Sequence, residues 1–94
     1  MAIPANNAVM SLSKDATMRS VGDGAVLLMV KSGQLYSCNE TARDFIGRLD
    51  GVRDFEVLVK EISLEYEVTP QTLTEDLSEL LEYLLNEGVL ISMS

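Results

Sequence analysis

The 94-residue sequence predicts one small α+β domain of winged-helix-like plan, in which an antiparallel sheet of two to three strands precedes three helices. Short apolar runs bounded by turn residues fill residues 17–38. Helical periodicity then dominates residues 40–87. Hydrophobic residues make up 47% of the chain, which is enough for a buried core in a domain of this size.

The N-terminal residues differ in character from the rest. Residues 1 to about 15 are small and polar, so we expect residues 1–15 to be a flexible tail and residues 16–94 to form the domain. Removing residues 1 to about 12 is then expected to change the free energy of unfolding by less than ~1 kcal/mol, the scale of ordinary surface changes.

The strands are predicted from apolar runs and the turns between them. Residues 17–21 form a short first strand, and residues 22–24, Gly-Asp-Gly, are turn residues. The six apolar residues 25–30 are too few for a helix and are read as a strand. The loop at 31–33 contains a glycine, which suits a hairpin into a last strand at residues 35–38.

The first two helices are predicted from their caps. Asn39 is a good N-cap because its side chain accepts a free backbone N–H, and Gly51 is expected to end the helix. Asp54 caps the second helix. Thr69 followed by Pro70 fits an N-cap with proline at the first helical position of the third helix.

The third helix is the clearest element of the sequence. Its leucines fall on one arc at 100° per residue, and Glu75, Glu79 and Glu82 fall opposite. Gly88 ends it, and residues 89–91 form a short extended end. The arc consists of Leu73, Leu77, Leu80, Leu81, Leu84 and Leu85.

The residue inventory argues against catalysis and against a bound metal or cofactor. One cysteine and no histidine cannot supply a structural zinc site. Cys38 has no histidine to activate it as a nucleophile, and a single cysteine allows no internal disulfide, which favours the cytoplasm. Residues 22–24 lack the lysine and the following helix of a phosphate loop.

The charge argues against nucleic acid. The net charge is −8, and no Lys or Arg follows Lys60, so a winged-helix DNA reader would lack phosphate contacts. No apolar run reaches the roughly 18 residues of a membrane span. The acids after Lys60 are Glu61, Glu65, Glu67, Glu75, Asp76, Glu79, Glu82 and Glu87.

The run LYSCNETARDFIGRLDG at residues 35–51 resembles the hallmark of the PqqD-like family. The matching residues are Asn39, Glu40, Thr41, Ala42, Ile46, Leu49, Asp50 and Gly51, whereas Cys38 stands where the family usually has leucine. The end of the chain is similar to the family's closing pattern through Asp76, Leu80, Leu81, Leu84, Gly88, Val89 and Leu90. The resemblance runs from about residue 24 to residue 91.

The resemblance implies a freestanding, non-catalytic recognition element for ribosomally made, modified peptides. Such domains hold the leader part of a precursor peptide and present it to a modifying enzyme, such as a radical SAM protein or a lasso-peptide leader peptidase. The pathway, quinone-cofactor or another modified peptide, stays open. So does the oligomeric state, including a dimer formed by swapping an element.

In the family the leader lies against the third strand and the last helix. The resemblance therefore implies peptide contacts from Leu35, Tyr36, Ser37, Cys38, Asp76, Leu80 and Tyr83, with Leu73, Leu77 and Leu84 as the floor of the groove. The acids of the helix would favour a leader or an enzyme carrying Lys or Arg. The alternative is an adaptor that binds a protein through the leucine face and binds no leader.

Overall fold

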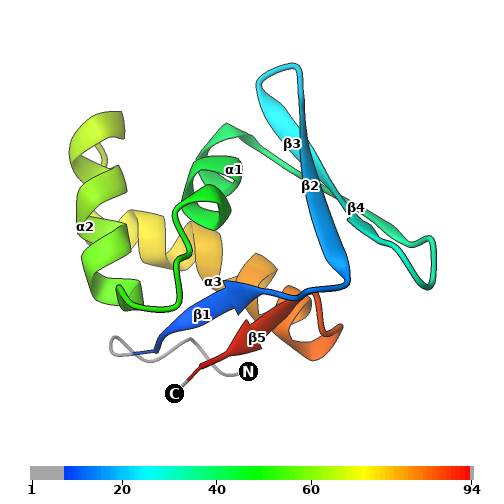
Figure 1. Ribbon diagram of the computed structural model, residues 1–94. Helices are drawn as coiled ribbons and strands as arrows, with labels where there is room; N and C mark the ends of the chain where they lie inside the picture. The colour runs from blue at the N-terminus through cyan, green and yellow to red at the C-terminus, as the bar shows by residue number, and fades with distance from the viewer. Residues whose placement is uncertain (1–7, 94) are drawn as a thin grey trace.

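The computed structural model describes residues 8–93 and confirms the α+β class (Figure 1). Strands fill the first part of the chain, three helices follow, and one short strand closes it. The elements are β1 (Met10–Leu12), β2 (Ala16–Val21), β3 (Gly24–Met29), β4 (Leu35–Cys38), α1 (Glu40–Gly47), α2 (Phe55–Tyr66), α3 (Pro70–Asn86) and β5 (Leu90–Ser92).

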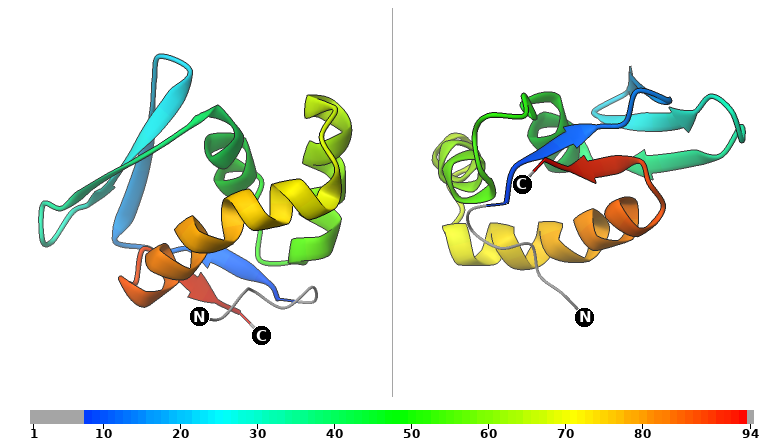
Figure 2. Two further views of the ribbon diagram at one scale, coloured as in Figure 1. Left: turned by 180° about the vertical axis from the view of Figure 1, so that it is seen from behind. Right: turned by 60° about the horizontal axis from the view of Figure 1, so that its bottom comes forward.

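The strands form two separate antiparallel sheets. The larger has the order β2-β3-β4, as expected for two successive hairpins. The smaller joins β1 to β5, so the start and the end of the described chain lie side by side (Figure 2). The hairpin of β3 and β4 projects away from the helices in both views of Figure 2, which leaves much of β4 accessible.

All three predicted N-caps are present. The side chain of Asn39 accepts the N–H of Ala42 at 2.9 Å, and that of Asp54 accepts the N–H of Val57 at 3.0 Å. Thr69 caps α3 in the same way, with Pro70 as the first helical residue. Each cap satisfies a backbone N–H that would otherwise lack a partner at the start of the helix.

The first helix is shorter than the sequence predicts. It ends at Gly47 with Arg48 as its C-cap, whereas Gly51 lies in the following loop at a φ of 73°. The Asp50 carboxylate accepts the backbone N–H groups of Val52 and Arg53, both at 2.9 Å. These bonds lower the pKa of Asp50 to about 2. They also order the loop that connects α1 to α2.

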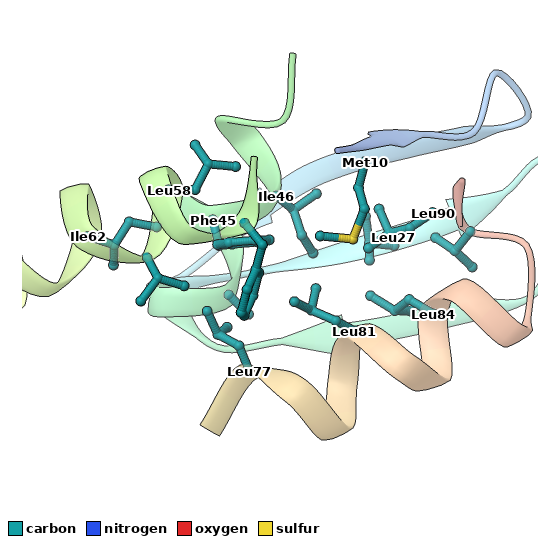
Figure 3. Packing of buried hydrophobic residues seen from close by; sticks show 14 of the residues in the cluster. Met10, Leu27, Phe45, Ile46, Leu58, Ile62, Leu77, Leu81, Leu84 and Leu90 are labelled. Carbon is teal, nitrogen blue, oxygen red and sulfur yellow. The ribbon is translucent and has the colours of Figure 1, made fainter. Parts of the chain in front are cut away.

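The core lies between the two sheets and the helices (Figure 3). Leu77, Leu81 and Leu84 point inward from α3 into a cluster that also contains Leu27 of the larger sheet and Met10 of the smaller one. The rings of Phe45 and Phe55 pack edge to face at 5.7 Å between their centroids and join α1 to α2. Four leucines of the α3 arc are therefore interior, and Leu80 and Leu85 are partly buried at its borders.

The expected tail over residues 1–15 is wrong for its second half. Residues 10–12 form β1, and Met10 is only 1% exposed. Its strand partner, Ser92, lies at the far end of the chain, so no local pattern announces the pairing. Residues 1–7 lie outside the described residues. Removing residues 1 to 12 is therefore expected to lower the free energy of unfolding by well over ~1 kcal/mol, because it removes a buried strand.

Met10→Ala should lower the free energy of unfolding by about 2–5 kcal/mol, as is typical when a fully buried methionine is truncated. Ser11→Ala, one residue along the same strand, should change it by less than ~0.5 kcal/mol. Urea unfolding followed by circular dichroism measures both. Equal stabilities of the two variants would contradict the burial of β1.

Candidate functional site

Strand β4 is an edge of the larger sheet. One side pairs with β3, and no strand among residues 8–93 pairs with the other. Its residues Leu35, Tyr36, Ser37 and Cys38 carry no charge, whereas the opposite edge strand, β2, contains Arg19. Charged residues are a common protection against unwanted strand pairing, so the edge of β4 is the unprotected one.

The register shows which backbone groups of β4 are free. The N–H of Met29 donates to the carbonyl of Gln34 at 3.0 Å, which makes these two a hydrogen-bonded pair. Because such pairs alternate along an antiparallel ladder, Tyr36 and Cys38 direct their backbone N–H and C=O groups toward β3. The corresponding groups of Leu35 and Ser37 point to the free edge.

The side chain of Tyr36 connects β4 to α3. It is 8% exposed and meets the ring of Tyr83 edge to face at 5.7 Å. Its hydroxyl hydrogen-bonds Gln34 Oε1 at 2.8 Å and lies 3.3 Å from Glu87 Oε1. Burial, and then the negative charge of Glu87, raise the pKa of Tyr36. The flank of α3 that carries Tyr83, together with the C-cap Glu87, therefore faces the strand.

A hollow follows α3 from this contact toward the start of α1. Asp76 and Leu80 line both of its parts. One part, of about 410 Å³, lies beyond the end of β4 and is lined by Asn39, Thr41, Ala42, Tyr66, Val68, Leu73, Asp76, Leu77 and Leu80. The other runs along α3 past Glu79, Glu82, Tyr83 and Asn86.

Tyr66 fixes one wall of the hollow. Its hydroxyl donates a hydrogen bond to the Asp44 carboxylate, which ties the end of α2 to α1. This bond, with burial as the next cause, raises the pKa of Tyr66 to about 12. The same bond lowers the pKa of Asp44. The Tyr66 hydroxyl therefore stays protonated and bonded to Asp44, which fixes this side of the hollow in the absence of a ligand.

The structure brings together most of the predicted site residues. Asp76, Leu80 and Tyr83 line the hollow, and Leu73 and Leu77 reach its floor. Leu84 does not, because it is fully buried in the core and lines neither part, so its expected contact with a peptide lacks support.

Several residues of the hollow were not predicted as contacts. Asn39, Thr41 and Ala42 belong to the hallmark run, which could have pointed to them. Tyr66 ends α2 and Val68 lies in the connection between α2 and α3, and no signal in the sequence places these two residues beside α1.

Two observations bear on the reactivity of the described residues. Burial raises the pKa of Cys38, so its thiol is a weak nucleophile at neutral pH. Among residues 8–93, no group of three or more His, Cys, Asp or Glu side chains is arranged to hold a metal ion. No helix in this part of the chain is long and apolar enough to cross a membrane.

Comparisons with known proteins agree with this geometry. The sequence profile described as coenzyme PQQ synthesis protein D (PqqD) matches residues 24–90. TbiB1 in complex with the TbiA(beta) leader peptide is similar in structure, with a TM-score of 0.72 and 25% identity over 85% of this chain and 93% of that one. Lasso peptide synthetase B1 complexed with the leader peptide shares the fold, with a TM-score of 0.73 and 24% identity over 87% and 96%. No curated protein matches.

Asp44→Asn should lower the pKa of Tyr66 from about 12 toward the ordinary value of 10.0, because the main cause of the shift is lost. Stability from a raised pKa is present below the unfolded value and is lost as the pH rises through the folded one. The wild type should therefore lose stability between pH 10 and about 12, and Asp44→Asn should lose less.

Ultraviolet absorbance titration, compared with a Tyr66→Phe variant, reports the pKa. Asp23→Asn, at a distant turn, is the charge-matched control and should leave the titration of Tyr66 unchanged. If Asp44→Asn also leaves it unchanged, the bond does not control this wall.

Proposed function

This chain belongs to the PqqD family, and on that premise we propose that it is a non-catalytic module that binds the leader region of a ribosomally made precursor peptide. The observation that carries the proposal is the uncharged free edge of β4 beside the hollow of α3. The two similar structures are themselves leader-peptide complexes, which supports the same ligand class here.

The leader binds as an added strand. Leu35 and Ser37 offer outward N–H and C=O groups at alternate positions, which is what an extended peptide needs for main-chain pairing. Such bonds give affinity with little regard to sequence. A peptide held in this way reaches a Kd of ~1 μM, or about −8 kcal/mol, after the cost of ordering it.

Side chains on one face of the leader enter the hollow of α3. A leader residue opposite Tyr36 lies on the α3 side of the sheet, where Tyr83 and Leu80 are its nearest walls. The contact with Tyr36 holds Tyr83 in place before any peptide arrives, and the hydrogen bond to Asp44 does the same for Tyr66 at the other end of the hollow. Preorganised walls lower the entropy cost of binding.

The charge of α3 favours a basic leader. The helix contains four acids and no base, and Glu87 follows at its C-cap. No ion pair within residues 8–93 involves them. Glu79 and Glu82 line one part of the hollow, whereas Asp76 lines both, so we choose Asp76 as the first acid to test for contact with a Lys or Arg of the peptide.

The bound leader is presented to a modifying enzyme, which we propose to be a radical SAM protein or a leader peptidase. The alternative, an adaptor that uses the leucine face of α3, is disfavoured by burial. Leu73, Leu77, Leu81 and Leu84 are at most 3% exposed, and only Leu80 and Leu85 of the arc are partly exposed, so that face offers a protein partner little apolar surface.

Proline substitutions test the added strand. Tyr36→Pro removes an N–H that β3 needs and should unfold the hairpin. Ser37→Pro removes an outward N–H and should leave the fold largely intact, yet weaken peptide binding by tenfold or more, about 1.4 kcal/mol. Peptides selected from a random library displayed on phage are the probes, with calorimetry for affinity and circular dichroism for the fold.

Ser20→Pro is the matched control. By the same alternation, its N–H points away from β3 at the free edge of β2. It should fold and bind the selected peptides as the wild type does. Failure to select any peptide, or selected peptides that bind Ser37→Pro as tightly as the wild type, would rule out binding at the edge of β4.

Asp76→Asn should weaken the binding of a selected Lys-containing peptide by about two- to fivefold, the range of exposed ion pairs. The loss should shrink as salt is added, because salt screens exposed charges. Asp23→Asn removes the same charge far from the hollow and should have no such effect. Equal losses in the two variants would mean that net charge, and not Asp76, attracts the peptide.

A further inference from the structure

The larger sheet has a second face, which the proposed function does not yet use. Its residues alternate along each strand with the buried ones, so their side chains lie on the side of the sheet opposite the core. We call it the outer face, and it consists of Thr17, Arg19, Val21, Val26, Leu28, Leu35 and Ser37. All of these residues belong to the three strands of the larger sheet.

One row across the outer face is apolar toward β4, where it carries two leucines. Thr17, Leu28 and Leu35 are aligned by the register of the three strands. Leu35 is 67% exposed and Leu28 is 36% exposed. The next row, Arg19, Val26 and Ser37, is polar at both ends. The two rows thus offer different surfaces at the same free edge of β4.

The row of Leu35 is incomplete on one side. Side chains directly opposite each other on one face of an antiparallel pair contact and stabilise each other. Leu35 has Leu28 on one side and no strand neighbour on the other among the described residues. A strand added at the edge of β4 would supply that neighbour, and the outer face is therefore continuous with the proposed peptide edge.

Backbone geometry sets which peptide residue arrives there. Leu35 directs its N–H and C=O to the free edge, so an antiparallel peptide residue opposite Leu35 exchanges both bonds with it. The side chain of that residue lies on the outer face beside Leu35. Its immediate neighbour in the peptide faces α3, and the next residue lies beside Ser37.

We propose that the outer face is a second specificity surface for the leader, which selects an apolar side chain opposite Leu35 and a polar or small one opposite Ser37. This inference rests on the proposed function. It implies that the recognised segment alternates between two different surfaces, the hollow of α3 and the row of Leu35. A peptide apolar on its α3-facing side alone is a weaker ligand than one that also fills this row.

A double-mutant cycle between protein and peptide tests the inference. The probe is the tightest peptide selected on phage from a random library against the full chain, with each position in turn replaced by serine. Leu35→Ser should weaken its binding by about three- to fivefold, the upper range of cross-strand pairs. It should couple to one apolar peptide position, so that serine there abolishes the effect of Leu35→Ser.

Val21→Ser is the matched control. Val21 is also an exposed aliphatic residue of the larger sheet, 59% exposed, but it lies on the far strand, β2. It should bind every peptide as the wild type does. Circular dichroism of both variants verifies that the fold is kept.

The outcomes separate this inference from the proposed function. If Ser37→Pro weakens binding but Leu35→Ser couples to no peptide position, the leader binds at the edge and the outer face plays no part. If Leu35→Ser instead dissociates a dimer in sedimentation and leaves peptide affinity unchanged, a second copy covers the face. Either result overturns the inference. If Ser37→Pro has no effect, the proposed function itself fails.

Discussion

The pairing of β4 with β3 is the constraint on which the rest of the structure depends. It places Tyr36 over α3 and leaves Leu35 and Ser37 at a free edge. The approach of the strands is close, since a Cβ on Gly24 would lie 2.2 Å from the carbonyl oxygen of Cys38. Only glycine fits at that position, so Gly24 is required for the two strands to pair this closely.

The two ends of β4 are anchored differently, and this difference shapes the site. At its start, the strand follows a projecting turn and is exposed. At its end, Asn39 caps α1, so the strand leads directly into a helix that packs against α2. A peptide laid along β4 would therefore pass from an open edge toward the hollow between α1 and α3. In the proposed mechanism, this short strand serves as a template for another strand.

Local patterns predicted the local features well. The three caps, the strand at residues 35–38 and the leucine arc of α3 were all recognisable, because each depends on residues close together in the sequence. The pairing of β1 with β5 was missed because Met10 and Ser92 are brought together only by the whole fold. The burial of Leu84 was not foreseen for a related reason, since an arc of leucines does not show which members face a groove and which face the core. The wall formed by Tyr66 depends on the crossing of α1 and α2, which no pattern sets.

The most direct measurement of the central claim is amide hydrogen exchange of β4, residue by residue, with and without a selected peptide. In the free protein, the N–H groups of Tyr36 and Cys38 should exchange slowly because they face β3, and those of Leu35 and Ser37 should exchange fast. Peptide binding should slow Leu35 and Ser37 specifically. Protection that appears elsewhere while these two amides stay fast would contradict binding of the leader as an added strand.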